Sequence, residues 1–198
     1  MIANLLQEHF RQPALQAEGT NNRTWMKNEV ARGWAVGHLN VQPYQHILEI
    51  GYGAGHTLQE VARKLKIGFL AGIDASPAMY RQAYRRNKRL IEQQLLQLHI
   101  GELPELSYPA HYFHTIYGVN AHLTWKDPAQ EFMRLAGMLK NKGRLVMLFQ
   151  SSGRKDTSIQ LASEKIRKDY DEAGLTHIHL EQRTLYPHTC VAAIGYKL

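Results

Sequence analysis

Residues 46–58 of the chain read His46-Ile47-Leu48-Glu49-Ile50-Gly51-Tyr52-Gly53-Ala54-Gly55-His56-Thr57-Leu58. A short apolar run that carries one acid is followed by three glycines at alternate positions, and then by apolar residues at helical spacing. The pattern predicts a strand, a tight turn and a helix over 57–65. Glycine can take positive φ and has no Cβ, so a ligand can approach this backbone closely. In an open α/β sheet such a turn lies where ligands bind.

A second apolar run, residues 69–74, ends in Asp74, about 23 residues after Gly51. This is close to the spacing of a carboxylate that holds a ribose. Both hydroxyls of a ribose can donate to one carboxylate, so the pair of features predicts a nucleoside ligand. The dinucleotide fingerprint would require glycine at the position of His56, which argues against a nicotinamide cofactor.

The stretch from Glu49 to Gly55, followed by the stretch from Gly72 to Met79, resembles the first and second motifs of the class I S-adenosylmethionine-dependent methyltransferases of the small-molecule type. The resemblance implies an α/β fold, namely a Rossmann-like doubly wound seven-stranded sheet that is mostly parallel, with an antiparallel last strand and an N-terminal helical extension. It implies S-adenosylmethionine as the cofactor. The cofactor-binding residues that we infer are Glu49, Gly51, Tyr52, Gly53, Gly55, Asp74, Ala75, Met79, Glu102, Leu103, Tyr117 and Gly118.

The rest of the chain supplies the remaining elements. Ser76-Pro77 is typical of a helix start, with serine as the cap and proline at the first helical position. The predicted elements after it are a helix to about residue 90, strands at 95–100 and 111–117, a helix over 128–139, a glycine-containing turn and strand within 140–149, a helix over 157–173, and strands at 177–185 and 189–197. The short connection between the last two strands requires them to be antiparallel.

The loop after the strand at 111–117 is where methyl group and acceptor meet in the family, so we expect Asn120 and His122 in the substrate pocket. His122 is the candidate general base, and the alternative is a histidine with no role in the chemistry. Asn120 is not followed by Pro-Pro-Tyr, which disfavours methylation of base amino groups. Where the family has an acid after the aromatic of this strand, Phe113 is followed by His114.

Residues 1–40 precede the first strand, and 23–39 carry apolar residues at helical spacing. The resemblance implies a lid over the cofactor, with Trp25, Asn28 and Trp34 as candidates and Trp25 and Asn28 in the substrate pocket. The alternative is that both tryptophans pack this helix on the sheet. We expect residues 1–198 to form a single methyltransferase domain, with 44–198 as its core.

Composition narrows the class of protein. The chain has 198 residues, a net charge of +7 and one cysteine, Cys190. No apolar run approaches the roughly 18 residues needed to cross a bilayer, and the first residues lack the features of a signal peptide, so we expect a cytoplasmic protein without membrane contact. The 11 histidines are scattered, and no metal site is predicted. The basic run 81–89 is interpreted as a solvated helix face rather than a nucleic-acid surface.

We therefore expect an enzyme that moves a methyl group by direct in-line displacement to a small-molecule acceptor. The alternatives are an RNA-directed methyltransferase, a nucleoside-binding or RNA-binding module without catalysis, and, less favoured, a nicotinamide-dependent oxidoreductase. A sulfonium methyl group is already electrophilic, so the protein mainly has to position it and exclude water. The sequence leaves the acceptor and the oligomeric state open.

Overall fold

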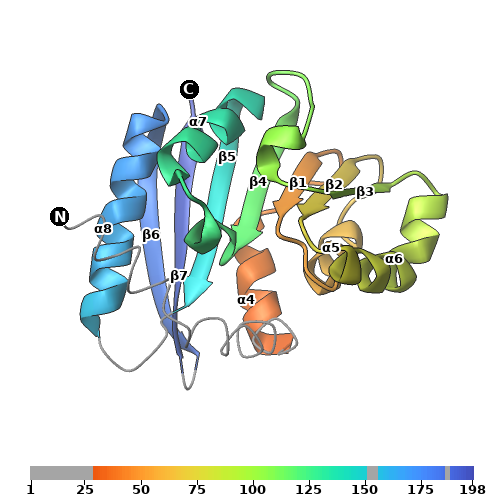
Figure 1. Ribbon diagram of the computed structural model, residues 1–198, viewed down its shortest axis with the longest axis horizontal. Coiled ribbons are helices and arrows are strands. Elements are labelled where there is room, and N and C mark those ends of the chain that lie inside the picture. The colour runs from red at the N-terminus through yellow and green to blue at the C-terminus, as the bar shows by residue number, and fades with distance from the viewer. Residues whose placement is uncertain (1–28, 151–155, 186–187) are drawn as a thin grey trace.

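The computed structural model describes residues 29–150, 156–185 and 188–198. This part of the chain forms one seven-stranded sheet in the order β3-β2-β1-β4-β5-β7-β6 (Figure 1). The strands are β1 (His46–Ile50), β2 (Phe69–Asp74), β3 (Leu96–Ile100), β4 (Phe113–Val119), β5 (Leu139–Gln150), β6 (Leu175–Leu185) and β7 (His188–Lys197).

The sheet is parallel except at one edge. β1 pairs in parallel with β2 and β4, and β2–β3 and β4–β5 are also parallel. β7 runs antiparallel to both β5 and β6. The predicted Rossmann-like sheet with an antiparallel strand near its end is therefore confirmed. The two residues between β6 and β7 require an antiparallel pair, because a parallel pair needs a crossover connection of about a dozen or more residues.

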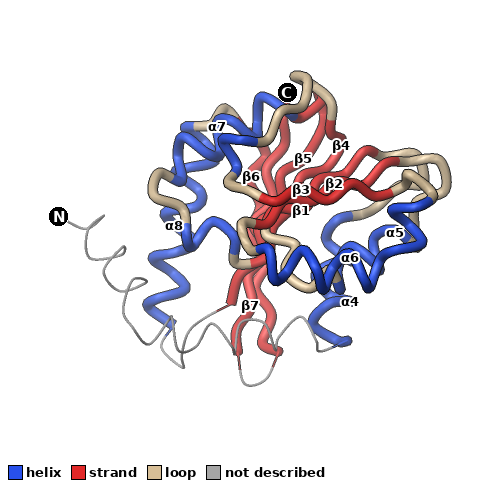
Figure 2. The backbone as a smooth tube through the Cα atoms, turned by 45° about the vertical axis from the view of Figure 1, so that its right-hand side comes forward, coloured by secondary structure: helices blue, strands red, loops and turns tan. Residues whose placement is uncertain are grey.

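Helices cover both faces of the sheet (Figure 2). On one face lie α4 (Glu29–Leu39), α5 (His56–Ala62) and α6 (Pro77–Glu92), and on the other α7 (Pro128–Met138) and α8 (Asp156–Glu172). Successive strand residues point to opposite faces, so Ile47 packs with the first group and Leu48 with the second. Burial on both faces explains the nearly continuous apolar runs of β1 and β2.

The chain changes direction along the sheet at β1. From β1 it proceeds through β2 to β3 at one edge, whereas β4 lies on the other side of β1 and leads to β5. In open α/β sheets the ligand crevice lies at such a point, beyond the carboxyl ends of the strands. The segments after β1 and β4 are therefore the candidates for the functional site.

Most predicted elements agree with the structure within two or three residues, but one turn is wrong. The predicted turn at 140–143 lies inside β5, which starts at Leu139 immediately after α7. Phe113 pairs with Leu139 and Thr115 pairs with Arg144, so β5 advances further than β4 over this interval. A bulge, with Lys142 at φ 63°, accommodates the extra residues without ending the strand.

The helix predicted over 23–39 is described from Glu29 onward as α4. Trp34 is 8% exposed and belongs to the apolar cluster beneath α4, and its ring lies 4.6 Å from that of His38. The packing interpretation therefore holds for Trp34, rather than the lid. Trp25 and Asn28 lie outside the described residues. Within the described ranges, no helix combines the length and the apolar character that crossing a membrane requires.

Candidate functional site

The glycine turn after β1 has the backbone that the sequence predicts. Gly51, Gly53 and Gly55 have φ of 72°, 52° and 75°, a region that side chains disfavour. A Cβ built on Gly53 would meet nothing within 4 Å, whereas one on Gly55 would lie 2.6 Å from the side-chain nitrogen of Asn87. Gly53 thus faces open space that a ligand can fill, and Gly55 allows α6 to pack against the turn.

Asp74 at the end of β2 is bound to the same turn. Its Oδ2 accepts a hydrogen bond from the backbone N–H of Gly53 at 2.8 Å, and its Oδ1 accepts one from the N–H of Ser76 at 2.9 Å. Two backbone donors thereby fix the orientation of the carboxylate. Each carboxylate oxygen has a second lone pair, so Asp74 retains the capacity to accept from a diol.

Glu49 lies beneath the turn and is 2% exposed. Its Oε2 accepts a hydrogen bond from the hydroxyl of Tyr117 on β4 at 2.7 Å, and Thr57 at the start of α5 also bonds the carboxylate. Burial, opposed by these hydrogen bonds and reinforced by the nearby charge of Asp74, raises the pKa of Glu49 to about 8. Glu49 and Tyr117 therefore form a buried pair that connects β1 to β4 below the ligand crevice.

Tyr52 lies in the glycine turn between Gly51 and Gly53. Its side chain is buried against Gly72, and its hydroxyl donates to the carbonyl of His99 on β3 at 3.0 Å. The ring therefore joins the turn to β2 and β3. Predicted as a cofactor-binding residue, Tyr52 directs its phenol into the protein.

The remaining predicted cofactor residues lie near the ends of β2 and β3. Ala75 is exposed, and the side chain of Met79 is buried one turn into α6. Glu102 is exposed before a short 3-10 helix, η1 (Leu103–Glu105), while Leu103 is 5% exposed and packs in the core. The N–H of Gly101 bonds the carbonyl of Asp74 at 3.2 Å, so this loop is attached to the end of β2.

The loop after β4 begins close to the glycine turn. Gly118 pairs with Ile50, and a Cβ on Gly118 would lie 3.1 Å from the Cβ of Ala121. Asn120 has φ 56°, and its Oδ1 accepts a hydrogen bond from the N–H of Gln150 at 3.3 Å. The predicted pocket residue Asn120 thus holds the ends of β4 and β5 together.

His122 lies among aromatic rings in the short helix η2 (Ala121–Thr124). The ring centroids of Phe149, Phe132 and Trp125 are 5.2, 6.2 and 6.4 Å from that of His122. Burial, with a smaller effect of Lys165, lowers the pKa of His122 to about 3. A general base for neutral pH needs a pKa near 7, so these surroundings do not favour the predicted catalytic role.

Two residues of α6 that we did not select from the sequence hold the turn in place. Asn87 donates from Nδ2 to the carbonyl of Gly55 at 3.0 Å, and Arg86 donates from Nε to the carbonyl of Ala54 at 2.9 Å. Asn87 interrupts the helical dihedral angles of α6, with φ −110° and ψ 17°. An asparagine in an otherwise long helical pattern is a weak signal, because only the tertiary fold shows what its side chain contacts.

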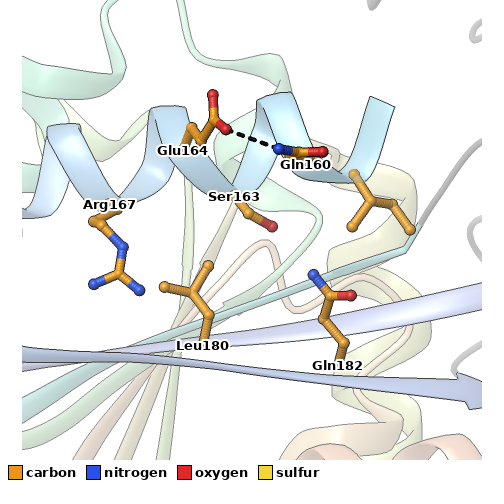
Figure 3. Close-up of a pocket in the computed structure, with 7 residues that line it drawn as sticks. Gln160, Ser163, Glu164, Arg167, Leu180 and Gln182 are labelled. Atoms are coloured by element: carbon orange, nitrogen blue, oxygen red, sulfur yellow. Dashed lines mark hydrogen bonds between the residues drawn. The ribbon is translucent and has the colours of Figure 1, made fainter. Parts of the chain in front are cut away.

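A separate cavity of about 420 Å³ lies between α8 and β6 (Figure 3). It is lined by Ile159, Gln160, Ser163, Glu164, Arg167, Leu180 and Gln182, and Gln160 donates to Glu164 across one helical turn at 3.2 Å. β4, β5 and β7 separate this cavity from β1. It is therefore not part of the site at the glycine turn.

Comparisons with known proteins indicate a methyltransferase domain. The family model described as a methyltransferase domain matches residues 47–143. The uncharacterized methyltransferase YdaC of Bacillus subtilis is 26% identical over 180 residues, which cover 86% of this chain and 93% of that protein. An S-adenosylmethionine-dependent methyltransferase of Aquifex aeolicus superposes with a TM-score of 0.70 at 13% identity, over 84% of this chain and 89% of that one. Phosphoethanolamine N-methyltransferase 2 of Haemonchus contortus, in complex with S-adenosylmethionine, gives 0.70 at 14% identity, over 86% of this chain and 53% of that one.

Proposed function

We propose that the chain is a class I S-adenosylmethionine-dependent methyltransferase, as the comparisons support, and that it transfers the methyl group to a small-molecule acceptor held beside the loop after β4. The observation that carries the proposal is the hydrogen bond from Gly53 to Asp74, next to the open space over Gly53. This contact places a bare backbone and a fixed carboxylate side by side at the carboxyl ends of neighbouring strands. Both suit a nucleoside, because the bare backbone lets it approach closely and the carboxylate can accept from its ribose hydroxyls.

In this proposal Asp74 accepts hydrogen bonds from the two ribose hydroxyls of the cofactor. Gly53 has no side chain, so the cofactor can lie directly against the backbone there. Glu102, exposed after β3, is within the loop that reaches the end of β2 and is the candidate partner of the adenine amino group. Leu103 packs in the core, so its contribution is to fix η1 rather than to provide an exposed apolar surface. Glu49 and Tyr117 support the turn from below.

Catalysis in this proposal is positional. When bound, S-adenosylmethionine supplies an electrophilic methyl group, so no nucleophilic side chain is required. The chain holds the ends of β1 and β4 at a fixed separation through the Glu49–Tyr117 hydrogen bond and the pairing of Gly118 with Ile50. His122 is not assigned as the base, since its lowered pKa keeps it neutral and a weak proton acceptor at physiological pH.

Two observations support a small molecule as the methyl acceptor. The loop residues Asn120-Ala121-His122-Leu123 lack the Asn-Pro-Pro-Tyr motif of enzymes that methylate amino groups of nucleic acids. The Haemonchus contortus enzyme, which has the same fold, is named for phosphoethanolamine, a small molecule. RNA as the acceptor is the alternative that an experiment has to separate.

The test is a labelled methyl donor added to the protein with either a small-molecule metabolite extract or total RNA. We expect label in the small-molecule fraction, and much less with the Asp74→Ala variant. Label that enters only RNA would overturn the choice of acceptor. Calorimetry with S-adenosylmethionine, S-adenosylhomocysteine and NAD gives the complementary result, with the first two binding and NAD not binding.

The proposal includes three statements about the whole protein. Residues 1–198 form a single methyltransferase domain, in which 44–198 are the core and 1–40 an extension. Trp25 and Asn28 of that extension, which lie outside the described residues, are the candidates for the substrate pocket, and the protein acts in the cytoplasm. Limited proteolysis with and without cofactor tests the extension, because a segment that closes over the site becomes protected when cofactor is present.

A further inference from the structure

A second cavity lies on the outer side of the glycine turn, between α5 and α6, which lie side by side in Figure 1. Its volume is about 310 Å³. The residues that line it are Gln59, Ala62, Arg63, Arg86, Asn87, Arg89, Leu90 and Gln93. Three of these side chains are guanidinium groups and none is a carboxylate, so the cavity wall is strongly positive.

The acids of these two helices are already used elsewhere. Glu60, the acid of α5, pairs with Arg32 at 2.6 Å, and Glu92, the acid of α6, pairs with Lys88 at 3.5 Å. Among the described residues, no ion pair involves the three arginines of the cavity. The three arginines are exposed, so their mutual repulsion in water is small, and an anion held among them gains N–H donors from several guanidinium groups at once.

Asn87 provides an independent indication of a ligand. It is 2% exposed, and its Nδ2 donates to the carbonyls of Gly55 and Ala83, each at 3.0 Å. Its Oδ1 is buried and has no hydrogen-bond partner among the described residues. A buried acceptor without a partner is unfavourable, so a ligand hydroxyl that displaces the atoms covering Oδ1 and donates to it gains affinity.

Arg86 joins the cavity to the glycine turn. Only its Nε is used in the hydrogen bond to Ala54, and the two terminal nitrogens, with four N–H groups, remain for another acceptor. Guanidinium groups bind phosphate through paired N–H donors. The same side chain can therefore hold the turn and contact an anion.

We propose that the cavity between α5 and α6 binds a small phosphorylated compound that also carries a hydroxyl group. The phosphate contacts Arg63, Arg86 and Arg89, and the hydroxyl donates to Asn87. The volume is at the lower end of the range for small-molecule sites and suits a compact ligand. A nucleic-acid strand instead requires an extended groove with stacking rings, and the lining contains no aromatic residue.

The test uses glycerol 3-phosphate, inorganic phosphate and glycerol as probes, with the full chain and no cofactor, at low ionic strength. Calorimetry or amide chemical shifts follow the titration. We expect saturable binding of glycerol 3-phosphate, weaker binding of phosphate and none of glycerol. Arg63→Gln and Arg89→Gln should each lower the affinity for glycerol 3-phosphate by about tenfold or more, which is the scale of one lost charged hydrogen bond.

Arg85→Gln is the matched control, because it removes the same charge from an exposed position of α6 that does not line the cavity. Its affinity should stay within about twofold of the parent protein, since a remote exposed charge is screened. Equal weakening in all three variants would mean diffuse attraction by net charge and would overturn the site. Binding of glycerol 3-phosphate that does not saturate would also overturn the site. The same holds if glycerol 3-phosphate does not bind while single-stranded RNA binds in a way that depends on Arg63 and Arg89.

Discussion

The segment after β1 and the segment after β4 follow neighbouring parallel strands, yet they are built differently. After β1, the turn offers backbone and open space at Gly53, with the Asp74 carboxylate fixed beside it. After β4, the polar side chains bind protein or are enclosed by it: Asn120 accepts from Gln150, and His122 lies among aromatic rings. In the proposed site, cofactor recognition therefore depends mainly on backbone geometry, whereas the two polar residues predicted for the acceptor make contacts within the protein.

Gly53→Val should produce the largest loss. A Cβ at this position meets no protein atom within 4 Å, so the protein should still fold, although a valine at φ 52° is strained and lowers stability. The side chain occupies the space that the cofactor needs. We expect the affinity for S-adenosylmethionine, measured by calorimetry, to fall by about 1,000-fold or more, roughly 4 kcal/mol. Gly55→Val is the contrasting variant: its Cβ would lie 2.6 Å from Asn87, so it should lower the melting temperature. Normal binding by Gly53→Val would show that the site is elsewhere.

Glu49→Gln should change how stability depends on pH. The pKa of Glu49 rises from 4.5 to about 8 on folding, so its contribution is fully present below pH 4.5 and is lost as the pH rises through 8. The variant should be less sensitive to pH over this window, by an amount on the order of a few kcal/mol. Urea unfolding at several pH values measures this. Parallel curves for the two proteins would contradict a buried, protonated Glu49.

Asp74→Ala should weaken S-adenosylmethionine binding by about 1.5 to 3 kcal/mol, because charged hydrogen-bonding partners are lost. The control is Asp127→Ala, which removes a carboxylate that caps α7 through the N–H of Gln130 at 3.1 Å. Asp127→Ala should lower the stability of the protein but leave its affinity for S-adenosylmethionine unchanged. Equal affinity losses in both would indicate a general effect of destabilisation.

His122→Phe should have the smallest effect on catalysis, with kcat within about threefold of the parent protein, as expected when no proton transfer depends on the residue. The substitution should instead change the stability of the fold at acid pH. The pKa of His122 falls from 6.5 to about 3 on folding, so its contribution is present above pH 6.5 and is lost as the pH falls through 3. The variant should unfold at a lower pH. A loss of kcat of about 100-fold, with an altered pH profile, would restore the general-base hypothesis.

The geometry of the glycine turn and of Asp74 could be predicted because its features are local. The features lie within 26 consecutive residues, 49–74: three alternating glycines, the acid before them and Asp74. Each has a specific backbone or hydrogen-bonding role in the structure. Tyr52 was named from its place in the motif, but the direction of its ring depends on Gly72 and His99 of two other strands. Motif position identified the backbone and not the side chain.

By itself the sequence determined the strand, turn and helix around Gly51–Gly55, the order of elements and the kind of ligand, because glycine conformations and apolar periodicity act over a few residues. Only the tertiary structure decided that His122 is enclosed by rings, that Asn87 and Arg86 hold the turn, and that three arginines surround one cavity. Those properties depend on residues far apart in the chain, and burial and electrostatic repulsion arise only when folding brings them together.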